Sequence, residues 1–283
     1  MKLIELEQRT PEWLQWRSFK ISSTDAATLM ERNPYETLLQ CFERKLTGKN
    51  KPVNDAMRRG AELESTALQW INDEMGTNYK PICAEHSDYP FLIASLDGFD
   101  VDAIIPVLEI KVPMYGVRRS IPDYEFCQLQ HQMLVTGARQ VRYLSFHELE
   151  SNIIECNRDD TFCDELLTKS QEFYKRLLNF DPPEPGPKDW EIFSTPEALK
   201  AAEALGIVRA RKMLDEEEEE FLEKELLEMT GNKNAIVGNF KITKVTRRGS
   251  IEYDRIPQLQ GLNLDPYRKT FSTSWKITQC KKT

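Results

Sequence analysis

Residues 95–113 read SLDGFDVDAIIPVLEIKVP, a stretch in which charged residues interrupt an apolar run. Its second half is apolar enough for a buried β-strand, yet Glu109 and Lys111 interrupt it. Side chains alternate between the two faces of a strand, so Glu109 and Lys111 share one face while Leu108 and Ile110 point to the other. Ionised groups are costly to bury unless they pair with each other or hold a metal.

Two interpretations account for these charges. In the first, Asp97 and Glu109 stand on adjacent strand ends and hold a hard cation such as Mg²⁺, which prefers oxygen ligands. Lys111 then lies beside the metal, where it can orient an attacking water or stabilise phosphate charge during phosphodiester hydrolysis. In the second, Glu109 and Lys111 form a structural ion pair, and Asp97-Gly98 is only a turn. The short motif taken alone favours the second, because D…E-x-K is common by chance.

The segments around this stretch have helical and strand patterns that predict an α/β or α+β fold, a mixed β-sheet flanked by helices. Residues 91–102 and 106–113 are typical of a hairpin-like pair of strands, and QVRYLSFH (140–147) has the pattern of a further strand. Capping residues, apolar spacing and terminal glycines predict helices near 10–19, at 33–48 from Asn33 or Pro34, and at 54–76, 122–137 and 161–180.

The best candidate for a domain boundary is the proline-dense connector DPPEPGPKDW, residues 181–190. It divides the chain into a main domain, residues 1–187, and a C-terminal extension, residues 188–283. In the extension, residues 195–229 have the pattern of one or two long helices, and the five glutamates 216–220 are typical of a solvated helix face. Two strand-like segments around a Gly-containing turn follow from residue 235, before a basic tail.

Composition argues against several classes of protein. The 283 residues are 40% hydrophobic and 30% charged, as in ordinary globular proteins, and no run approaches the roughly 20 apolar residues of a membrane span. The N-terminus has no apolar signal segment, and the six cysteines are scattered, which favours free thiols in the cytoplasm over disulfides, a zinc site or an iron–sulphur cluster. The three histidines suggest no catalytic triad.

Charge is unevenly distributed along the chain, whose formal net charge is −8. Eleven basic and three acidic residues lie between Lys233 and Thr283, so this tail could track a phosphate backbone. The rest of the chain is acidic. That argues mildly against a nucleic-acid enzyme, unless basic groups cluster locally or metal offsets the carboxylates.

Four segments, in order between residues 8 and 147, resemble the lambda-exonuclease / YqaJ-type viral recombinase family of the PD-(D/E)xK nuclease superfamily. SLDGF and LEIKVP are similar to the family's S-P-D-G and L-E-I-K-C-P segments. RTPEWLQWRSFKISSTD resembles its W-x-x-x-R…I-T-A-S pattern, RRGAELESTAL its G-x-x-x-E helix, and QLQHQMLVTG its Q-x-Q-x-x-M-x-V-T-G helix. Leu96 and Val112 depart from the usual proline and cysteine, but neither change removes a catalytic group. The resemblance implies a restriction-endonuclease-like core.

The resemblance assigns roles to the charged residues of the core. It implies that Asp97 and Glu109 bind the metal, with the backbone carbonyl of Ile110 as a further ligand. Glu64 should supply another carboxylate, directly or through water, although the residues alone favour an exposed helix glutamate. Lys111 should position or activate the attacking water. The implied cofactor is Mg²⁺, as two ions for which Mn²⁺ substitutes.

Further residues are expected to hold the substrate. Gln130 should face the site, with Gln128 as a less certain partner; a polar face of a packed helix is the alternative for both. Arg17 matches the arginine that grips the 5′-phosphate of a DNA end, where a guanidinium can bond bidentately. Ser22 and Thr24 follow it, where a helix N-terminus suits a phosphate, although a serine here could also be a simple N-cap.

The expected activity is that of a Mg²⁺-dependent 5′-to-3′ exonuclease, which digests one strand of linear duplex DNA to mononucleotides. The 3′ single strand that remains would serve a phage-type annealing protein in recombination. The resemblance also implies a ring-shaped homotrimer. The protein would be encoded by a phage or prophage and located in the bacterial cytoplasm, and no association with a membrane is expected. Two alternatives stay open: an endonuclease or repair or restriction nuclease with the same core, and an inactive DNA-binding module.

Overall fold

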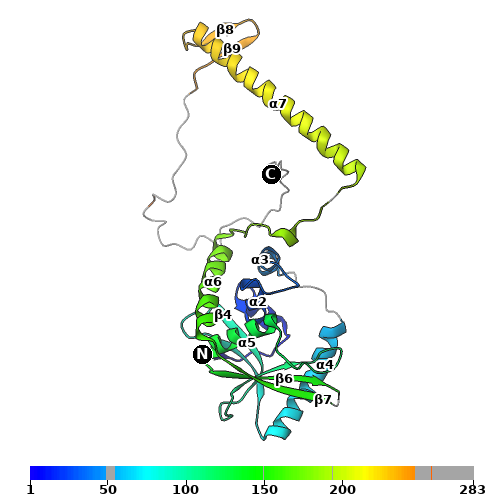
Figure 1. Cartoon of the computed structure of the whole chain (residues 1–283). Helices are drawn as coiled ribbons and strands as arrows, with labels where there is room; N and C mark the ends of the chain where they lie inside the picture. The colour runs from blue at the N-terminus through cyan, green and yellow to red at the C-terminus, as the bar shows by residue number, and fades with distance from the viewer. Residues whose placement is uncertain (49–54, 149, 193, 246–255, 257–283) are drawn as a thin grey trace. The chain divides into compact units, whose positions relative to one another are not determined.

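The computed structural model describes residues 1–48, 55–148, 150–192, 194–245 and 256 (Figure 1). The chain forms two compact units, Met1–Glu191 and Ile192–Thr283. This division lies just after the proline-dense connector.

A seven-stranded mixed sheet forms the centre of the first unit (Figure 1). Its strand order is β1-β3-β4-β5-β6-β7, and β2 pairs with β4. The β2–β4 and β5–β6 pairs are parallel and the others antiparallel. The strands are β1 (Lys2–Ile4), β2 (Ile21–Ser22), β3 (Lys80–Glu85), β4 (Leu92–Phe99), β5 (Val107–Lys111), β6 (Gln140–His147) and β7 (Glu150–Asn157). The mixed sheet flanked by helices confirms the predicted fold class.

Helices cover this sheet (Figure 1). They are α1 (Pro11–Arg17), α2 (Ala26–Leu29), α3 (Leu38–Thr47), α4 (Asp55–Met75), α5 (Asp123–Thr136) and α6 (Asp160–Asn179), with short 3₁₀ turns at Ser23–Asp25 and Pro187–Asp189. Local signals set several of their ends: Thr10 caps α1, whose first residue is a proline, and Gly137 ends α5 in the left-handed conformation.

Helix α3 begins later than the sequence suggested. It starts at Leu38 and not at Asn33 or Pro34, because Thr37 and Gln40 form a capping box. Ahead of the cap, the side-chain oxygen of Asn33 accepts a hydrogen bond from the backbone N–H of Tyr35 and forms a turn. Strands β1, β2, β3 and β7 were also not expected. Only one of the eight residues of β7 is buried, so the strand carries little of the apolar alternation by which strands are predicted.

The two faces of the sheet carry separate apolar clusters. Alternation along β5 sends Val107 and Glu109 to one face and Leu108 and Ile110 to the other. The first face packs against α5 in a cluster that includes Val107, Leu129, Met133, Val141 and Tyr143. The second packs against α4 in a cluster that includes Ala67, Ile71, Leu108, Ile110 and Leu144. The charged face of β5 therefore lies on the α5 side.

Gly98 allows β4 to pack closely against its neighbours. A Cβ atom at this position would lie 2.9 Å from the Cβ of Tyr79 and 3.0 Å from a methyl carbon of Leu108. No side chain fits there without a shift of the backbone. The residue next to Asp97 is thus a glycine for steric reasons, and it stands in a strand and not in a turn.

The second unit contains one long helix and a hairpin. Helix α7 (Pro196–Met229) is a single helix of 34 residues that Thr195 caps, where the sequence allowed one or two. Strands β8 (Ala235–Val237) and β9 (Phe240–Ile242) pair antiparallel around Gly238, as expected. Most of the predicted basic tail lies outside the described residues. Among the helices in the described ranges, none has the length and apolar character to cross a bilayer.

Candidate active site

The site is centred on Glu109, whose side chain is only 2% exposed. Its Oε1 accepts a hydrogen bond from Gln128 Nε2 at 2.6 Å and contacts the ammonium of Lys111, and its Oε2 accepts one from Gln132 Nε2 at 2.5 Å. The ammonium of Lys111 also donates to Gln128 Oε1 at 3.1 Å. Strand β5 supplies the carboxylate of Glu109 and the ammonium of Lys111. One face of α5 supplies the two amides of Gln128 and Gln132, which hold that carboxylate in place.

Asp97 faces this group from the neighbouring strand β4. Its Oδ2 accepts a hydrogen bond of 2.8 Å from the backbone N–H of Ile110. Burial raises the pKa of Asp97 well above its ordinary value, and the nearby carboxylates of Glu109 and Glu64 raise it further, against the opposing effect of Lys111. In the absence of additional positive charge, the ionised form of Asp97 is therefore disfavoured.

Lys111 stays protonated at its position between the carboxylates. Burial alone would lower its pKa, but Glu109 and Asp97 outweigh that effect and raise the pKa above its ordinary value. Its ammonium carries three protons, and contacts with Glu109 and Gln128 account for two of them. A third proton remains for a substrate oxygen or a water.

Glu64 lies on α4, and its carboxylate pairs with Arg9 and not with the other acidic residues of the site. Its Oε2 accepts a hydrogen bond of 2.5 Å from Arg9, whose side chain is about half exposed. Glu64 is nevertheless near enough to Asp97 to raise the pKa of that carboxyl. The expected acidic partner is thus close to the site but paired with an arginine that the sequence analysis did not single out.

The expectation for Gln130 was wrong in its geometry. Its side chain is fully buried and bonds to the backbone at the end of β7, donating to Asn157 O at 2.9 Å and accepting from Asp159 N at 2.8 Å. The reason is the period of the helix: residues four apart share a face, and a residue midway between them points away. Gln128 and Gln132 therefore contact Glu109. Gln132, which no motif had indicated, is the residue that was missed.

A second cluster gathers the residues expected to bind a DNA end. Arg17 donates from Nη2 to Ser22 Oγ at 3.0 Å and to Thr24 Oγ1 at 3.2 Å. Its guanidinium also lies over the Trp13 ring, 4.3 Å from the centroid. Burial lowers the pKa of Arg17, and Asp25 opposes the shift. The structure thus brings the three predicted residues together, with the Trp13 ring packed against the guanidinium.

Strand β4 connects this cluster with the carboxylates. Trp13 Nε1 donates to Ser95 Oγ at 2.9 Å, and Ser95 precedes Asp97 by two residues on the same face of the strand. Strand β2, which carries Ser22, pairs in parallel with the start of β4. The elements that carry the arginine cluster and those that carry the acidic residues therefore meet at β4.

The donors at the acidic end fit a hard cation. Mg²⁺ is commonly held by one or two carboxylates and otherwise keeps water or substrate oxygens as ligands. Asp97 and Glu109 supply two carboxylates beside the Ile110 carbonyl, and the raised pKa of Asp97 is the effect that a cation would reverse. Across the described ranges, no three or more His, Cys, Asp or Glu residues gather as a metal-binding group, so Glu64 is not part of one in this conformation.

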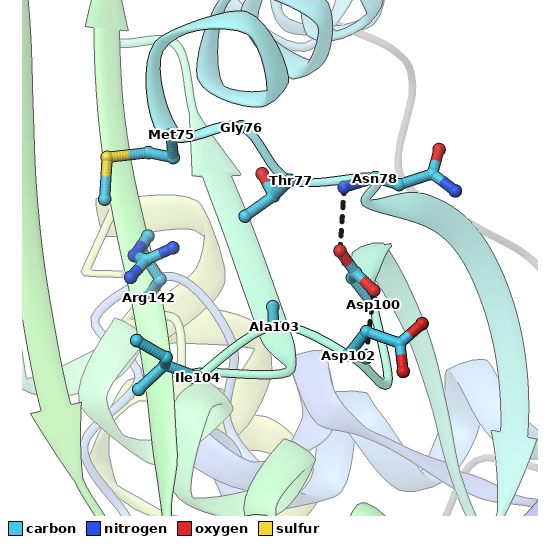
Figure 2. A pocket seen from close by; sticks show the side chains of 9 residues that line it. All are labelled: Met75, Gly76, Thr77, Asn78, Asp100, Asp102, Ala103, Ile104 and Arg142. Atoms are coloured by element: carbon cyan, nitrogen blue, oxygen red, sulfur yellow. Dashed lines mark hydrogen bonds between the residues drawn. The ribbon is translucent and has the colours of Figure 1, made fainter.

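A separate pocket of about 400 Å³ lies elsewhere in the first unit (Figure 2). The end of α4, the β4–β5 loop and one residue of β6 line it: Met75, Gly76, Thr77, Asn78, Asp100, Asp102, Ala103, Ile104 and Arg142. None of the predicted site residues is among them. The candidate site is instead a surface built along β4 and β5.

Comparison with known proteins agrees with this geometry. Residues 12–139 match the model of the YqaJ-like viral recombinase domain. An alkaline exonuclease from Laribacter hongkongensis, LHK-Exo, has a similar structure, with 25% identity, a TM-score of 0.51 and coverage of 61% of this chain and 94% of that chain. Its complex with dAMP matches equally well. A comparison with curated proteins found no match. Residues 12–139 therefore resemble the YqaJ-like viral recombinase domain, and the first unit has the fold of a nuclease of the lambda-exonuclease type.

Proposed function

We propose that the protein is a Mg²⁺-dependent 5′-to-3′ exonuclease that digests one strand of linear duplex DNA from its ends. The observation that carries the proposal is that the elements bearing Arg17, Ser22 and Thr24 contact β4, the strand of Asp97. A hydrolytic centre alone would suit any nuclease of this fold. A phosphate-binding cluster beside it suits an enzyme that begins at a 5′ end.

In this proposal the chain's own groups divide the work. Asp97, Glu109 and the Ile110 carbonyl would hold the metal, and Glu64 would join them after leaving Arg9. The bound cation would lower the pKa of a water and polarise the phosphate. Gln128 and Gln132 keep the Glu109 carboxylate oriented, as partners behind a metal ligand commonly do. The remaining proton of Lys111 would hold the attacking water or the phosphate oxygen.

At the other end, Arg17 would grip the terminal phosphate. Its guanidinium can bond a phosphate bidentately, and the hydroxyls of Ser22 and Thr24 can contribute further hydrogen bonds. Asp25 holds Ser22 in place, because its Oδ2 accepts hydrogen bonds of 2.7 Å from both the backbone N–H and the hydroxyl of Ser22. The distance between the two clusters would then determine where the strand is cut.

The match of residues 12–139 to the YqaJ-like viral recombinase domain supports the rest of the proposal. The products would be mononucleotides, and the 3′ single strands would pass to a phage-type annealing protein. We further propose two Mg²⁺ ions with Mn²⁺ as a substitute, a homotrimeric ring around the DNA, and action in the cytoplasm of a bacterial host.

The test uses linear duplexes labelled on each strand, with a 5′-phosphate on only one of them. The phosphorylated strand should disappear first, digestion should stop when EDTA removes the metal, and closed circular DNA should stay intact. Nicking of the circles would instead support an endonuclease. Arg17→Ala should reduce the rate on phosphorylated ends by roughly 10- to 100-fold, as expected when hydrogen bonds to a charged group are lost.

A matched control is Arg139→Ala, which removes a more exposed arginine that pairs with Asp160. It should leave the rate and the preference for phosphorylated ends unchanged. If Arg17→Ala digests phosphorylated and unphosphorylated ends as the parent does, the end-binding role is wrong.

A further inference from the structure

Arg9 holds Glu64 through a contact that the local backbone does not favour. Its Nη2 donates to Glu64 Oε2 at 2.5 Å, across 55 residues of sequence. The φ angle of Arg9 is 72°, in the left-handed region that residues with a side chain seldom adopt. The two side chains are 54% and 27% exposed, and an exposed ion pair of this kind stabilises a fold little. The contact is therefore weak enough for a stronger partner of Glu64 to displace Arg9.

Arg9 is also one of the countercharges of the acidic site. Three carboxylates act on one another there, those of Asp97, Glu109 and Glu64. Lys111 contacts Glu109, and Arg9 contacts Glu64, so two cations of the protein face three acids. With Arg9 in this position, the three acids do not gather into a metal-binding group in the ranges that the structure describes. The guanidinium thus occupies the acid that a metal would need as its third carboxylate.

Helix α1 reaches from the acidic site to the arginine cluster. Arg9 lies two residues before its first residue and contacts Glu64, while Arg17 is its last residue and contacts Ser22. Seven helical residues are about 10 Å long. A strand held at Arg17 by its terminal phosphate would therefore extend beside α1 toward the acidic site. The half-exposed guanidinium of Arg9 lies at the end of that path where the strand would be cut.

We propose that Arg9 exchanges Glu64 for a phosphate of the DNA strand when the enzyme binds metal and substrate. The inference rests on the proposed nuclease function and adds a substrate-binding residue to the same site. Without metal, the guanidinium neutralises Glu64. Positive charge bound at Asp97 and Glu109 attracts the Glu64 carboxylate and repels Arg9. The released guanidinium then bonds a phosphate beside it, and arginine suits this role because it can bond a phosphate through two N–H groups.

Calorimetric titration of the full-length chain with Mg²⁺, without DNA, tests the first half of the exchange. Arg9→Gly removes the guanidinium and suits the left-handed backbone. It should bind Mg²⁺ about 2- to 5-fold more tightly than the parent, as expected when a competing exposed ion pair is lost. In a Glu64→Gln background the gain should largely disappear, because the shared acid is gone. Arg139→Ala, which removes an exposed arginine paired with Asp160, is the control and should leave the affinity unchanged.

Binding of a 5′-phosphorylated linear duplex tests the second half. Both proteins carry Lys111→Ala so that the DNA stays intact. With Mg²⁺ present, fluorescence anisotropy should show that Arg9→Gly weakens DNA binding about tenfold, as when a hydrogen bond to a charged group is lost. The slope of log affinity against log salt should become shallower by about 0.9, the value for one phosphate contact. In EDTA the difference should largely disappear, because Arg9 then stays on Glu64.

The outcomes separate this inference from the proposed function. If the parent takes up no Mg²⁺, the proposed metal site is wrong and the exchange is wrong with it. If the parent binds Mg²⁺ but Arg9→Gly binds it no more tightly, the pair with Glu64 is a structural contact and only the exchange is wrong. If Arg9→Gly weakens DNA binding equally with Mg²⁺ and with EDTA, or not at all, the guanidinium is not released by the metal, and the exchange is again overturned.

Discussion

Asp25 and Asp97 are acids of the same fold in opposite electrostatic surroundings. Asp25 is fully buried, and the cations of Lys45 and Arg44 contact it at 2.6 and 2.8 Å. Burial opposes its ionisation, but these two cations lower its pKa far below the ordinary value. Arg44 in turn bonds Glu36, so the charges around Asp25 are balanced within the protein.

Asp97 has the opposite balance. Its partners are one backbone N–H and a lysine already shared with Glu109, while two other carboxylates repel its charge. The comparison shows that burial by itself does not define a functional acid. What separates the two sites is whether the chain supplies its own countercharge, and around Asp97 it leaves that charge to be supplied from outside.

The largest expected effect comes from Asp97→Asn. Activity on linear DNA should fall on the order of 10³-fold or more, because a carboxylate ligand of the proposed metal is lost, and with it the charge stabilisation that the cation would supply. The melting temperature should stay the same or rise, since the neutral amide removes repulsion with Glu109. Asp102→Asn, an exposed acid in the following loop, is the control and should change neither quantity.

Asp25→Asn should act chiefly on stability. It leaves the buried Lys45 and the partly buried Arg44 without their shared acid, so the free energy of unfolding in urea should fall by about 3–5 kcal/mol. The exposed acid Glu31, replaced by glutamine, should cost far less. A loss below about 1 kcal/mol for Asp25→Asn would contradict the view that this cluster is structural.

His131 predicts how stability depends on pH near the Asp25 cluster. Burial lowers its pKa from 6.5 to about 4, although Asp25 opposes the shift. Between these two values the unfolded chain binds a proton at His131 that the folded chain does not. Stability should therefore fall as the pH drops from 6.5 to 4, by up to about 3 kcal/mol, and this part of the loss should be complete below pH 4.

The measurement for His131 is urea unfolding at a series of pH values. His131→Gln cannot titrate in this range, so its stability should depend less steeply on pH than that of the parent. Equal slopes for the two proteins would show that His131 is not the group responsible.

A smaller effect separates the glutamines of α5. Gln132→Ala should reduce activity or metal affinity about 10- to 100-fold, as for other residues that hold a metal ligand. Gln130→Ala should lower the melting temperature, because Asp159 N–H and Asn157 O lose their partner, and should leave the metal requirement unchanged. The opposite result would return Gln130 to the site and remove Gln132 from it.

The sequence predicted those parts of the site that depend on local geometry. Alternation along one strand placed Glu109 and Lys111 together, and the short separation of Arg17 from Ser22 and Thr24 brought those groups into contact. The glutamine was assigned from a motif and not from helix periodicity, although four-residue spacing was visible in the sequence and indicated Gln128 with Gln132.

Other contacts depend on tertiary packing and left no local signal. Arg9 reaches Glu64 from 55 residues away, and Lys45 reaches Asp25 from the next long helix. Strand β7 was missed for a related reason, because an exposed edge strand shows weak apolar alternation. Local sequence patterns thus indicated candidate site residues. The tertiary packing determines which of the charged residues form ion pairs within the protein.

Gly98 has a consequence for how inactive variants are interpreted. Adjacent positions would fail for opposite reasons: Asp97 when it loses its functional group, and Gly98 when it gains any side chain at all. A screen for activity alone would find variants at both positions inactive and would wrongly identify both residues as catalytic. Only a record of how much folded protein each variant yields would distinguish a lost reaction from a sheet that can no longer close around Tyr79.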